Sequence, residues 1–268
     1  MTGASILLVG AGGMLGRDLA AALRGRAVLA LTRAELDVTD AAAVQRAVDG
    51  RDVVINATAY TRVDDAESNE DAASAVNAIA PGILAAASAS AGARLVHVST
   101  DYVFDGTATT PYREDALRNP VSAYGRTKAE GEERVLAEHG DGSAIVRTAW
   151  LYGEHGVSFP ATMLRLAGER ETLTVVDDQR GQPTWSRDLA ERIVELVDLG
   201  TPDGIFHGTN AGATTWFGFA REVFSLAGLD PERIQPTDSA AYQRPAPRPA
   251  YSVLGHDGWA GIGLAPMR

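Results

Sequence analysis

The sequence contains no cysteine in its 268 residues, and Lys128 is its only lysine. Without a thiol, the chain cannot form a disulfide, use a thiolate as a nucleophile or bind zinc through cysteine. Every other residue among the 24 lysines and arginines is arginine. An ammonium and a guanidinium differ in shape, hydration and ease of deprotonation. We therefore treat Lys128 as a candidate functional residue.

Positive charge is scarce as well, because 24 basic side chains face 35 acidic ones and give a formal net charge of −11. General nucleic-acid and anionic-membrane binders carry a basic surface, so we expect neither partner. The longest uncharged stretch, 72–93, is mostly alanine and serine and contains Pro81 and Gly82, which favours a packed helix over a membrane span. The first residues lack a basic segment followed by an apolar one. We expect a cytoplasmic protein.

Short apolar segments alternate with helical patterns through the first 150 residues. The predicted strands are 6–9, 28–31, 53–56, 95–99 and 145–147, and the predicted helices are 14–23, 41–48, 72–89 and 124–138. Strands and helices that alternate in this way form βαβ units around a parallel sheet covered on both faces. Right-handed crossovers then favour an α/β fold with a Rossmann-type doubly wound sheet.

Beyond residue 150 the alternation loosens. We predict helices at 159–167, 189–199 and 216–227 and short strands at 173–176 and 205–208. Five prolines between 230 and 251 predict that regular structure is absent there. We expect a dinucleotide-binding domain at 1–150 and a smaller substrate-binding lobe at 151–268, with a return of the chain to the first domain near 186–208.

A glycine-rich turn follows the first predicted strand and opens the first predicted helix. Gly10, Gly13 and Gly16 have the spacing Gly-x-x-Gly-x-x-Gly. Glycine allows positive φ angles, lets the backbone approach a pyrophosphate and lets the helix pack on its strand. The helix N-terminus supplies donors and a favourable dipole for phosphates. This turn, with Met14 and Leu15 inside it, predicts a bound dinucleotide.

The end of the second predicted strand bears on which dinucleotide binds. It has no acidic residue at its tip to hold a ribose 2′-hydroxyl, and Arg33 stands there instead. An arginine at this place can meet the 2′-phosphate of NADP, although a solvated Arg33 is almost as good an interpretation. We predict NADPH as the cofactor, with NADH as an alternative.

Tyr124 precedes Lys128 by four residues, so the two side chains share one face of a helix. An ammonium near a phenol stabilises the phenolate and lowers the pKa of the tyrosine. A tyrosine tuned in this way can donate a proton to a carbonyl oxygen as hydride arrives. Lys128 can also hold the nicotinamide ribose hydroxyls with its rotatable donors.

Thr100 directly follows the predicted strand at 95–99, and ligands of open α/β sheets bind beyond the carboxyl ends of the strands. Its hydroxyl can bind the substrate carbonyl and stabilise developing negative charge. A threonine at a strand end is as often a simple cap. Together with Tyr124 and Lys128, however, Thr100 predicts an active site.

Several segments resemble a known family. They are 56–64 (NATAYTRVD), 99–106 (STDYVFDG), 147–153 (RTAWLYG), 178–184 (DQRGQPT) and the pair Arg248-Pro249 followed by Ser252. Together with the glycine turn and Tyr124-x-x-x-Lys128, they resemble the dTDP-4-dehydrorhamnose reductase family of the extended short-chain dehydrogenase/reductase superfamily. The resemblance implies NAD(P)H-dependent reduction of a dTDP-linked 4-keto-6-deoxyhexose.

The resemblance also assigns roles by position. The implied catalytic residues are Thr100, Tyr124 and Lys128. The residues implied to line the cofactor beyond the glycine turn are Asp37 and Val38, which would border the adenine, and Ala57, Thr58 and Ala59. Tyr102 and Trp150 would face the sugar, and Arg248 would meet the diphosphate, for which an arginine fork is well suited.

The chain departs from the family at one implied metal site. Some members bind magnesium at a dimer interface through clustered glutamates, and Asp18 stands where one of these is expected. We predict no metal ligands and leave a homodimer open.

Two alternatives remain within this resemblance. A sugar-nucleotide epimerase of the same superfamily shares these motifs and would retain its NAD tightly. A non-catalytic regulatory subunit, such as that of methionine adenosyltransferase, also resembles these reductases. A dehydratase is disfavoured because it needs an Asp-Glu pair after the threonine, whereas Asp101 is followed by Tyr102.

Overall fold

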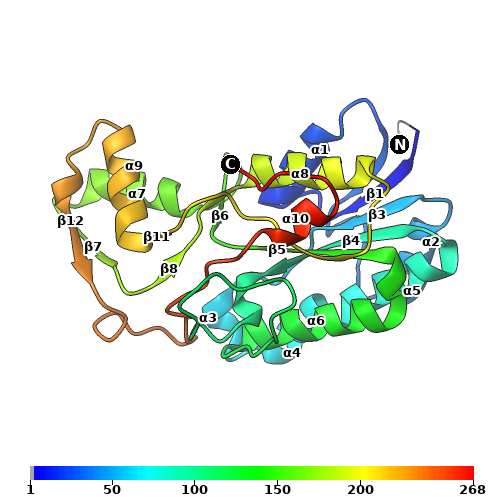
Figure 1. Cartoon of the computed structure of the whole chain (residues 1–268), viewed down its shortest axis with the longest axis horizontal. Helices are drawn as coiled ribbons and strands as arrows, with labels where there is room; N and C mark the ends of the chain where they lie inside the picture. The colour runs from blue at the N-terminus through cyan, green and yellow to red at the C-terminus, as the bar shows by residue number, and fades with distance from the viewer. Residues whose placement is uncertain (1–2) are drawn as a thin grey trace.

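A six-stranded parallel sheet forms the centre of the molecule in the computed structural model, which describes residues 3–268 (Figure 1). Its strand order is β10-β5-β4-β3-β1-β2. The strands are β1 (Ser5–Val9), β2 (Ala27–Leu31), β3 (Val53–Asn56), β4 (Arg94–Thr100), β5 (Ser143–Thr148) and β10 (Gly204–His207). The chain passes from β1 to β2 on one side and then to β3 on the other, which places a topological switch point between β1 and β3. The predicted doubly wound Rossmann-type sheet is confirmed.

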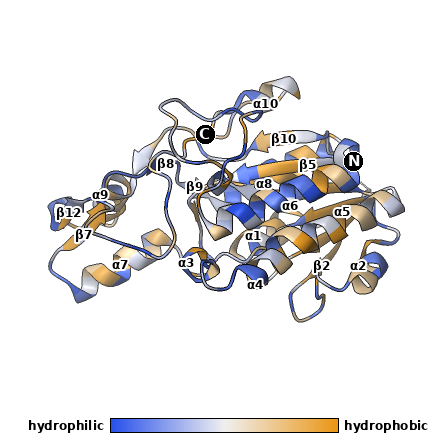
Figure 2. Cartoon of the chain, turned by 90° about the horizontal axis from the view of Figure 1, so that it is seen from below, coloured by the Kyte–Doolittle hydropathy of each residue, from blue (hydrophilic) through white to orange (hydrophobic). Residues whose placement is uncertain are grey.

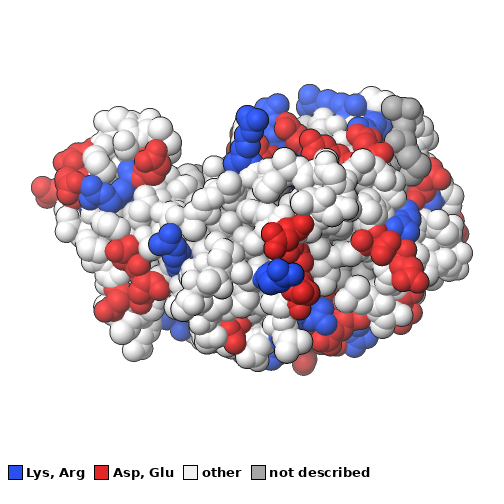
Figure 3. All heavy atoms as spheres, in the orientation of Figure 1, with Lys and Arg blue, Asp and Glu red and all other residues white. Residues whose placement is uncertain are grey.

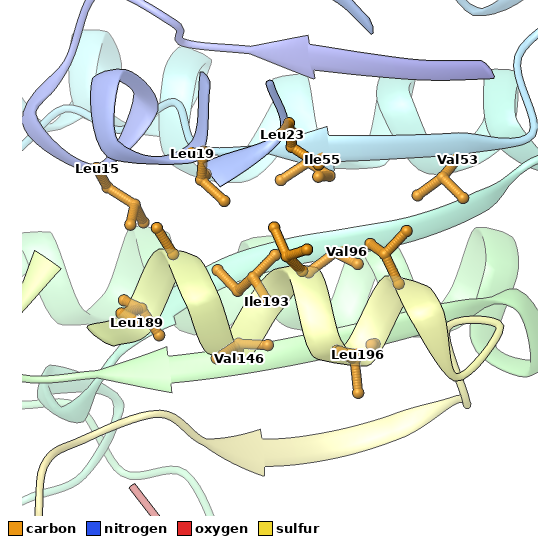
Figure 4. Close-up of a cluster of buried hydrophobic side chains, with 14 of the residues drawn as sticks. Leu15, Leu19, Leu23, Val53, Ile55, Val96, Val146, Leu189, Ile193 and Leu196 are labelled. Atoms are coloured by element: carbon orange, nitrogen blue, oxygen red, sulfur yellow. The ribbon is translucent and has the colours of Figure 1, made fainter. Parts of the chain in front are cut away.

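Helices cover both faces of the sheet. One face carries α1 (Met14–Ala22) and α8 (Ser186–Asp198), and the other carries α2 (Ala41–Val48), α5 (Ala80–Ala91) and α6 (Ala123–His139). The strands are largely hydrophobic, whereas α6 and α8 carry many hydrophilic residues (Figure 2). In the first layer, Leu19 of α1 and Ile193 of α8 point toward Ile55 and Val96 of the sheet (Figure 4). A parallel sheet buried on both faces explains the continuous apolar strands of the sequence.

The predicted helix at 72–89 is a run of three helical pieces. These are α4 (Glu70–Ser74), the π-helical turn η1 (Ala75–Ile79) and α5. The run Glu70–Ala91 is apolar enough and long enough to cross a membrane, but 56% of its most apolar window is buried within the molecule, as in a core helix. In the π turn, Asn77 accepts a hydrogen bond from the Tyr60 amide and donates to Thr127 of α6. The turn therefore ties the loop after β3 to α6.

A smaller unit packs at one end of the sheet and is formed by α7 (Phe159–Glu169), β7 (Leu173–Val176), α9 (Trp216–Leu226) and β12 (Ile234–Thr237) (Figure 1). Its core contains Met163, Phe224 and Ile234. The prediction that prolines exclude regular structure after residue 230 is wrong for β12, which includes Pro236 and pairs in parallel with β7. Both strands of this two-stranded sheet are edges, and an edge strand tolerates a missing N–H.

Short elements connect these layers. They are α3 (Val63–Ala66), η2 (Asp101–Val103), η3 (Gly140–Gly142), β6 (Leu151–Tyr152), β8 (Arg180–Gly181), β9 (Thr184–Trp185), β11 (Thr214–Thr215), η4 (Pro231–Arg233) and α10 (Asp257–Gly261). The segment from α8 to β10 belongs to the sheet layers. The C-terminal α10 returns there too, because Trp259 stacks on Phe206 and its indole donates to the carbonyl of His207 at 2.8 Å.

We expect Gly131→Ala in α6 to destabilise the protein, although alanine favours helices. A Cβ at Gly131 would lie 2.1 Å from the backbone oxygen of Asn77, and overpacking of this kind costs about 1–3 kcal/mol. Gly168→Ala in α7 is the matched control, since nothing lies within 4 Å of its Cβ position, and there we expect a gain of up to ~1 kcal/mol. Urea unfolding of both variants measures the difference. Equal effects of the two substitutions would contradict the close approach of α6 to η1.

Candidate active site

The predicted site residues gather at the carboxyl edge of the sheet. Thr100 ends β4, Ala57 follows β3, Trp150 follows β5, and the glycine turn follows β1. Tyr124 and Lys128 reach the same edge from the first turns of α6, where Ser122 caps the helix by accepting a hydrogen bond from the Gly125 amide.

The glycine turn is held by contacts that exclude side chains. Gly10 has φ +87°, and a Cβ there would lie 2.8 Å from the backbone of Ala57. A Cβ at Gly16 would lie 2.1 Å from the oxygen of Gly10. The amide of Gly10 donates to the Leu31 carbonyl at 3.0 Å, which fixes the turn against the end of β2. These contacts explain the first and third glycines of the motif.

The first turn of α1 is suited to phosphate. Gly13 is its N-cap residue, and no side chain among the described residues caps the helix there. The amides of Met14 and its neighbours are therefore free to bind an anion, which the helix dipole also favours. Leu15 points the other way, into the core, so only its backbone can serve a ligand. This cradle fits the pyrophosphate of a dinucleotide.

The tip of β2 carries a residue that the sequence analysis missed. Glu35 folds back and accepts hydrogen bonds from the Thr32 amide at 2.9 Å and the Thr32 hydroxyl at 2.7 Å. An acidic group therefore does stand at this tip, although it comes three residues after Thr32, the first residue beyond β2. Arg33 is exposed beside Glu35. Hydrogen bonds from Thr39 lower the pKa of Asp37, and the charge of Arg33 lowers it further by a smaller amount. Val38 is buried in the core between the sheet and α2.

The end of β3 forms a second wall. Asn56 is fully buried, and its Oδ1 accepts from the amide and the hydroxyl of Thr58, at 3.0 and 2.6 Å. Ala57 and Thr58 are partly buried, and Ala59 is exposed. Gly10 packs directly on the backbone of Ala57 and Thr58, so these two residues adjoin the glycine turn. That Ala57, Thr58 and Ala59 line a cofactor stays a prediction.

Tyr124 lies beside Thr100 at the centre of the edge, and the ring of Tyr102 packs against Tyr124 edge to face, with centroids 5.4 Å apart. Burial raises the pKa of Tyr124 to about 12; the hydrogen bond with Thr100 opposes this rise, and the charge of Asp101 adds to it. The expectation that Lys128 brings this tyrosine toward neutrality is wrong for the structure, because the Lys128 amine faces β4 instead. A phenol with so high a pKa is fully protonated, which is the form that donates a proton.

Lys128 is buried to 1% exposure. Its Nζ donates to the carbonyl of Val98 at 2.7 Å and lies 3.5 Å from Nε2 of His97. Burial lowers the pKa of Lys128 to about 8, against the charge of Glu132 one turn further along α6, which raises it. An amine with this pKa changes protonation near neutral pH, whereas an arginine cannot.

Asp101 is a second residue that the sequence analysis did not assign. It is 2% exposed, and its Oδ1 accepts from the Thr100 hydroxyl at 3.0 Å. Burial raises the pKa of Asp101 to about 6, against hydrogen bonds from Ser252 and Thr100. The sequence could have indicated Asp101, because it directly follows the candidate residue Thr100. Asp101 orients the hydroxyl that faces Tyr124.

Trp150 stands where the sheet meets the smaller unit. Its φ of +47° is unusual for a bulky residue. The indole stacks on Trp216 at 3.6 Å and fills the space that a side chain at Gly181 would need. Strained backbone conformations of this kind cluster at functional sites.

A cavity of about 560 Å³ lies in the smaller unit beyond Trp216. Phe159 and Trp216 give it an apolar wall, and Arg170, Arg244 and Arg248 bring positive charge to its lining. The cavity adjoins the site through Arg248, whose charge acts on Tyr102.

Arg248 already has a carboxylate partner. Its Nη1 and Nη2 donate to the two oxygens of Asp64 in α3, at 2.9 and 3.0 Å. This bidentate pair joins α3 to the loop around Arg248, which contains Pro245, Pro247 and Pro249 and is called the proline-rich loop. The guanidinium that was expected to meet a diphosphate is therefore held in place by Asp64.

Asp18, at the family's expected magnesium position, hydrogen-bonds to the hydroxyl of Ser186 and lies 3.9 Å from the imidazole of His155. Across residues 3–268, three or more His, Asp or Glu side chains nowhere gather in a metal-binding arrangement.

Known proteins match almost the whole chain. The family model described as the RmlD substrate binding domain matches residues 4–268. A dTDP-4-keto-6-deoxy-D-glucose reductase of Streptomyces niveus is 51% identical over 266 residues, which span 98% of this chain and 92% of the relative.

Two solved structures are also similar. The dTDP-4-dehydrorhamnose reductase of Clostridium acetobutylicum has a TM-score of 0.94 at 42% identity, with 98% of this chain and 94% of that chain covered. The Bacillus anthracis enzyme of the same name, solved in complex with NADP, has a TM-score of 0.95 at 36% identity over 99% and 95% of the two chains. The chain belongs to the dTDP-4-dehydrorhamnose reductase family.

Proposed function

We propose that this protein reduces the 4-keto group of a dTDP-4-keto-6-deoxyhexose with NADPH and yields dTDP-L-rhamnose or a related dTDP-deoxysugar. The observation that carries the proposal is the position of Tyr124, Lys128 and Thr100 beside an uncapped, glycine-lined helix N-terminus. A proton donor and a dinucleotide cradle at one sheet edge are what hydride transfer to a ketone requires. The reductase relatives described above support the substrate class.

The cofactor would lie across the switch point between β1 and β3. The amides at the start of α1 would hold its pyrophosphate, and Ala57 and Thr58 would line its middle. Arg33 would meet a 2′-phosphate at the tip of β2. When bound, NADPH supplies the hydride, and the protein's own residues do the rest.

The proton step belongs to Tyr124. As hydride reaches C4 of the sugar, the C4 oxygen gains negative charge and takes the proton of the Tyr124 hydroxyl, which leaves a phenolate. When substrate is bound, the single hydroxyl proton of Thr100 turns from Asp101 to the same oxygen and stabilises the charge as it develops. The tyrosine must regain a proton before the next turnover.

The nucleotide diphosphate would occupy the cavity beside Trp216. Charged side chains of both signs are interspersed on the face shown in Figure 3, with uncharged surface across its middle. Because the net charge is −11, an anionic substrate needs local cations, and Arg170, Arg244 and Arg248 supply them. Asp64 keeps the Arg248 guanidinium oriented when no substrate is bound.

The direct test is an absorbance assay with dTDP-4-keto-6-deoxy sugars and each cofactor in turn. We expect oxidation of NADPH, with a larger kcat/KM than for NADH because of Arg33. A folded protein that oxidises neither cofactor with any such sugar would refute the reductase function. Tightly bound NAD in the purified protein, without net turnover, would favour an epimerase instead.

We expect Lys128→Arg to lose at least 99% of kcat/KM while the protein stays folded. The lysine pocket places its single nitrogen 2.7 Å from the Val98 carbonyl, and a planar guanidinium of fixed charge cannot reproduce this geometry. Arg126→Lys is the matched control, since Arg126 lies on the same helix, is exposed and pairs with Glu70. Circular dichroism and steady-state kinetics compare the two. Full activity of Lys128→Arg would remove the special role of the lone lysine.

We expect Arg33→Ala to raise KM for NADPH about tenfold and to leave KM for NADH nearly unchanged, because a lost contact to the 2′-phosphate weakens only the phosphorylated cofactor. Arg46→Ala, an exposed arginine on α2, serves as the control for net charge. Parallel loss with both cofactors would show that Arg33 does not read the 2′-phosphate.

A further inference from the structure

A row of buried polar side chains leads from the cofactor wall to the lone lysine. Asn56 of β3 contacts His97 of β4, and His97 contacts Lys128 of α6. Asn56 and His97 have no exposed surface, and Lys128 has 1%. Burying a polar group costs free energy unless it is hydrogen-bonded, and Asn56 and His97 bond to each other. The proton step described above does not use His97.

The orientation of the Asn56 amide is fixed by its neighbour. The backbone N–H of Thr58 can only donate, and it lies 3.0 Å from the carboxamide oxygen of Asn56. A flipped amide would set two donors against each other. The NH2 group of Asn56 must therefore face His97, whose Nδ1 lies 3.0 Å away.

This orientation decides the tautomer of His97. Because Asn56 donates to Nδ1, that nitrogen carries no proton. Burial and the neighbouring Lys128 hold the pKa of His97 well below its usual range, so the ring is neutral and its one proton is on Nε2. The Nε2–H group then points at Nζ of Lys128, 3.5 Å away.

A donor aimed at an amine favours the unprotonated amine, which has a lone pair, over the ammonium, which has only donors. The other groups around Lys128 act differently. The Val98 carbonyl on β4 accepts from Nζ, and Glu132 on α6 favours the ammonium but is itself paired with Arg147 of β5 and with Arg118. Tyr124, on the same helix, is neutral.

We infer that His97 is a positioning residue for Lys128: its Nε2–H, set by Asn56 and Thr58, directs the amine toward Val98 and lowers its affinity for a proton. The same Asn56–Thr58 pair forms the wall that would line the cofactor, so the lysine's proton affinity is linked to the cofactor site. The role of Lys128 in reduction rests on the proposed function. The tautomer of His97 and the pKa of Lys128 are properties of the free protein and can be measured without substrate.

The first test uses the wild-type protein. The five histidines are labelled with 15N, and their ring nitrogens are read by NMR between pH 6 and 9. We expect His97 to carry its proton on Nε2 and none on Nδ1 throughout this range. A proton on Nδ1 of His97 would overturn the inference, and this outcome requires no variant to fold.

The second test measures the lysine directly. Because the chain has one lysine, lysine labelled with 13C at Cε gives a single side-chain signal, whose midpoint we expect at about pH 8 in the wild type. In Asn56→Asp, the carboxylate still accepts from Thr58 but now also accepts from Nδ1–H of His97. The tautomer then reverses, Nε2 becomes an acceptor for the ammonium, and we expect the midpoint to rise by at least one pKa unit, a tenfold gain in proton affinity.

Asn77→Asp is the matched control for the added charge. Asn77 is equally buried and contacts α6 through Thr127, without touching His97. We expect the His97 tautomer to stay unchanged and the lysine midpoint to move less than in Asn56→Asp. A reversed tautomer in Asn56→Asp with no greater shift than in the control would overturn the inference. Neither measurement needs turnover, so a negative reductase assay would not affect the result.

Discussion

The close approach of backbone segments at the carboxyl edge of the sheet is the constraint on which the site depends. Gly10 touches the backbone at Ala57, and Gly16 lies under the oxygen of Gly10, so that neither position has room for a side chain. These contacts bring the N-terminus of α1 over the gap between β1 and β3. The uncapped amides of that helix attract an anion there. Thr100 reaches the same edge from the end of β4, and Tyr124 and Lys128 reach it from α6.

Helix α6 places three ionisable side chains on one face. Tyr124, Lys128 and Glu132 follow each other at intervals of four residues, and each meets a different neighbour: Thr100 at the edge, β4 in the middle and Arg147 behind. Burying a lysine and an ion pair costs desolvation energy that the pairing only partly recovers. Close packing of α6 at Gly131 against the π turn keeps these groups aligned. Helix α6 therefore holds the charged groups of Lys128 and Glu132 at fixed positions against the sheet.

The smaller unit carries a cavity with an apolar wall and a positively charged lining. Its cavity joins an apolar wall at Trp216 to the arginines of the proline-rich loop, and Trp150 bridges it to the sheet through a stacked indole pair. The Asp64–Arg248 pair crosses from α3 to this loop. This pair fixes the orientation of the Arg248 guanidinium in the lining of the cavity.

The sequence by itself determined the parallel sheet, the glycine turn and the positions of Tyr124 and Lys128 one turn apart on the same helix, because periodicity and spacing act over a few residues. It also placed Thr100 at a strand end. It did not show that Pro236 lies in a strand, which depends on β12 being an edge. It misjudged the pKa of Tyr124, since burial and the direction of the lysine side chain outweigh sequence proximity.

The hydrogen bonds between Glu35 and Thr32 are local, because the two residues are three apart in the sequence. Only the tertiary structure brought His97 between Asn56 and Lys128. These contacts join residues from two strands and a helix, and hydrogen-bond orientation and desolvation are set by that three-dimensional neighbourhood.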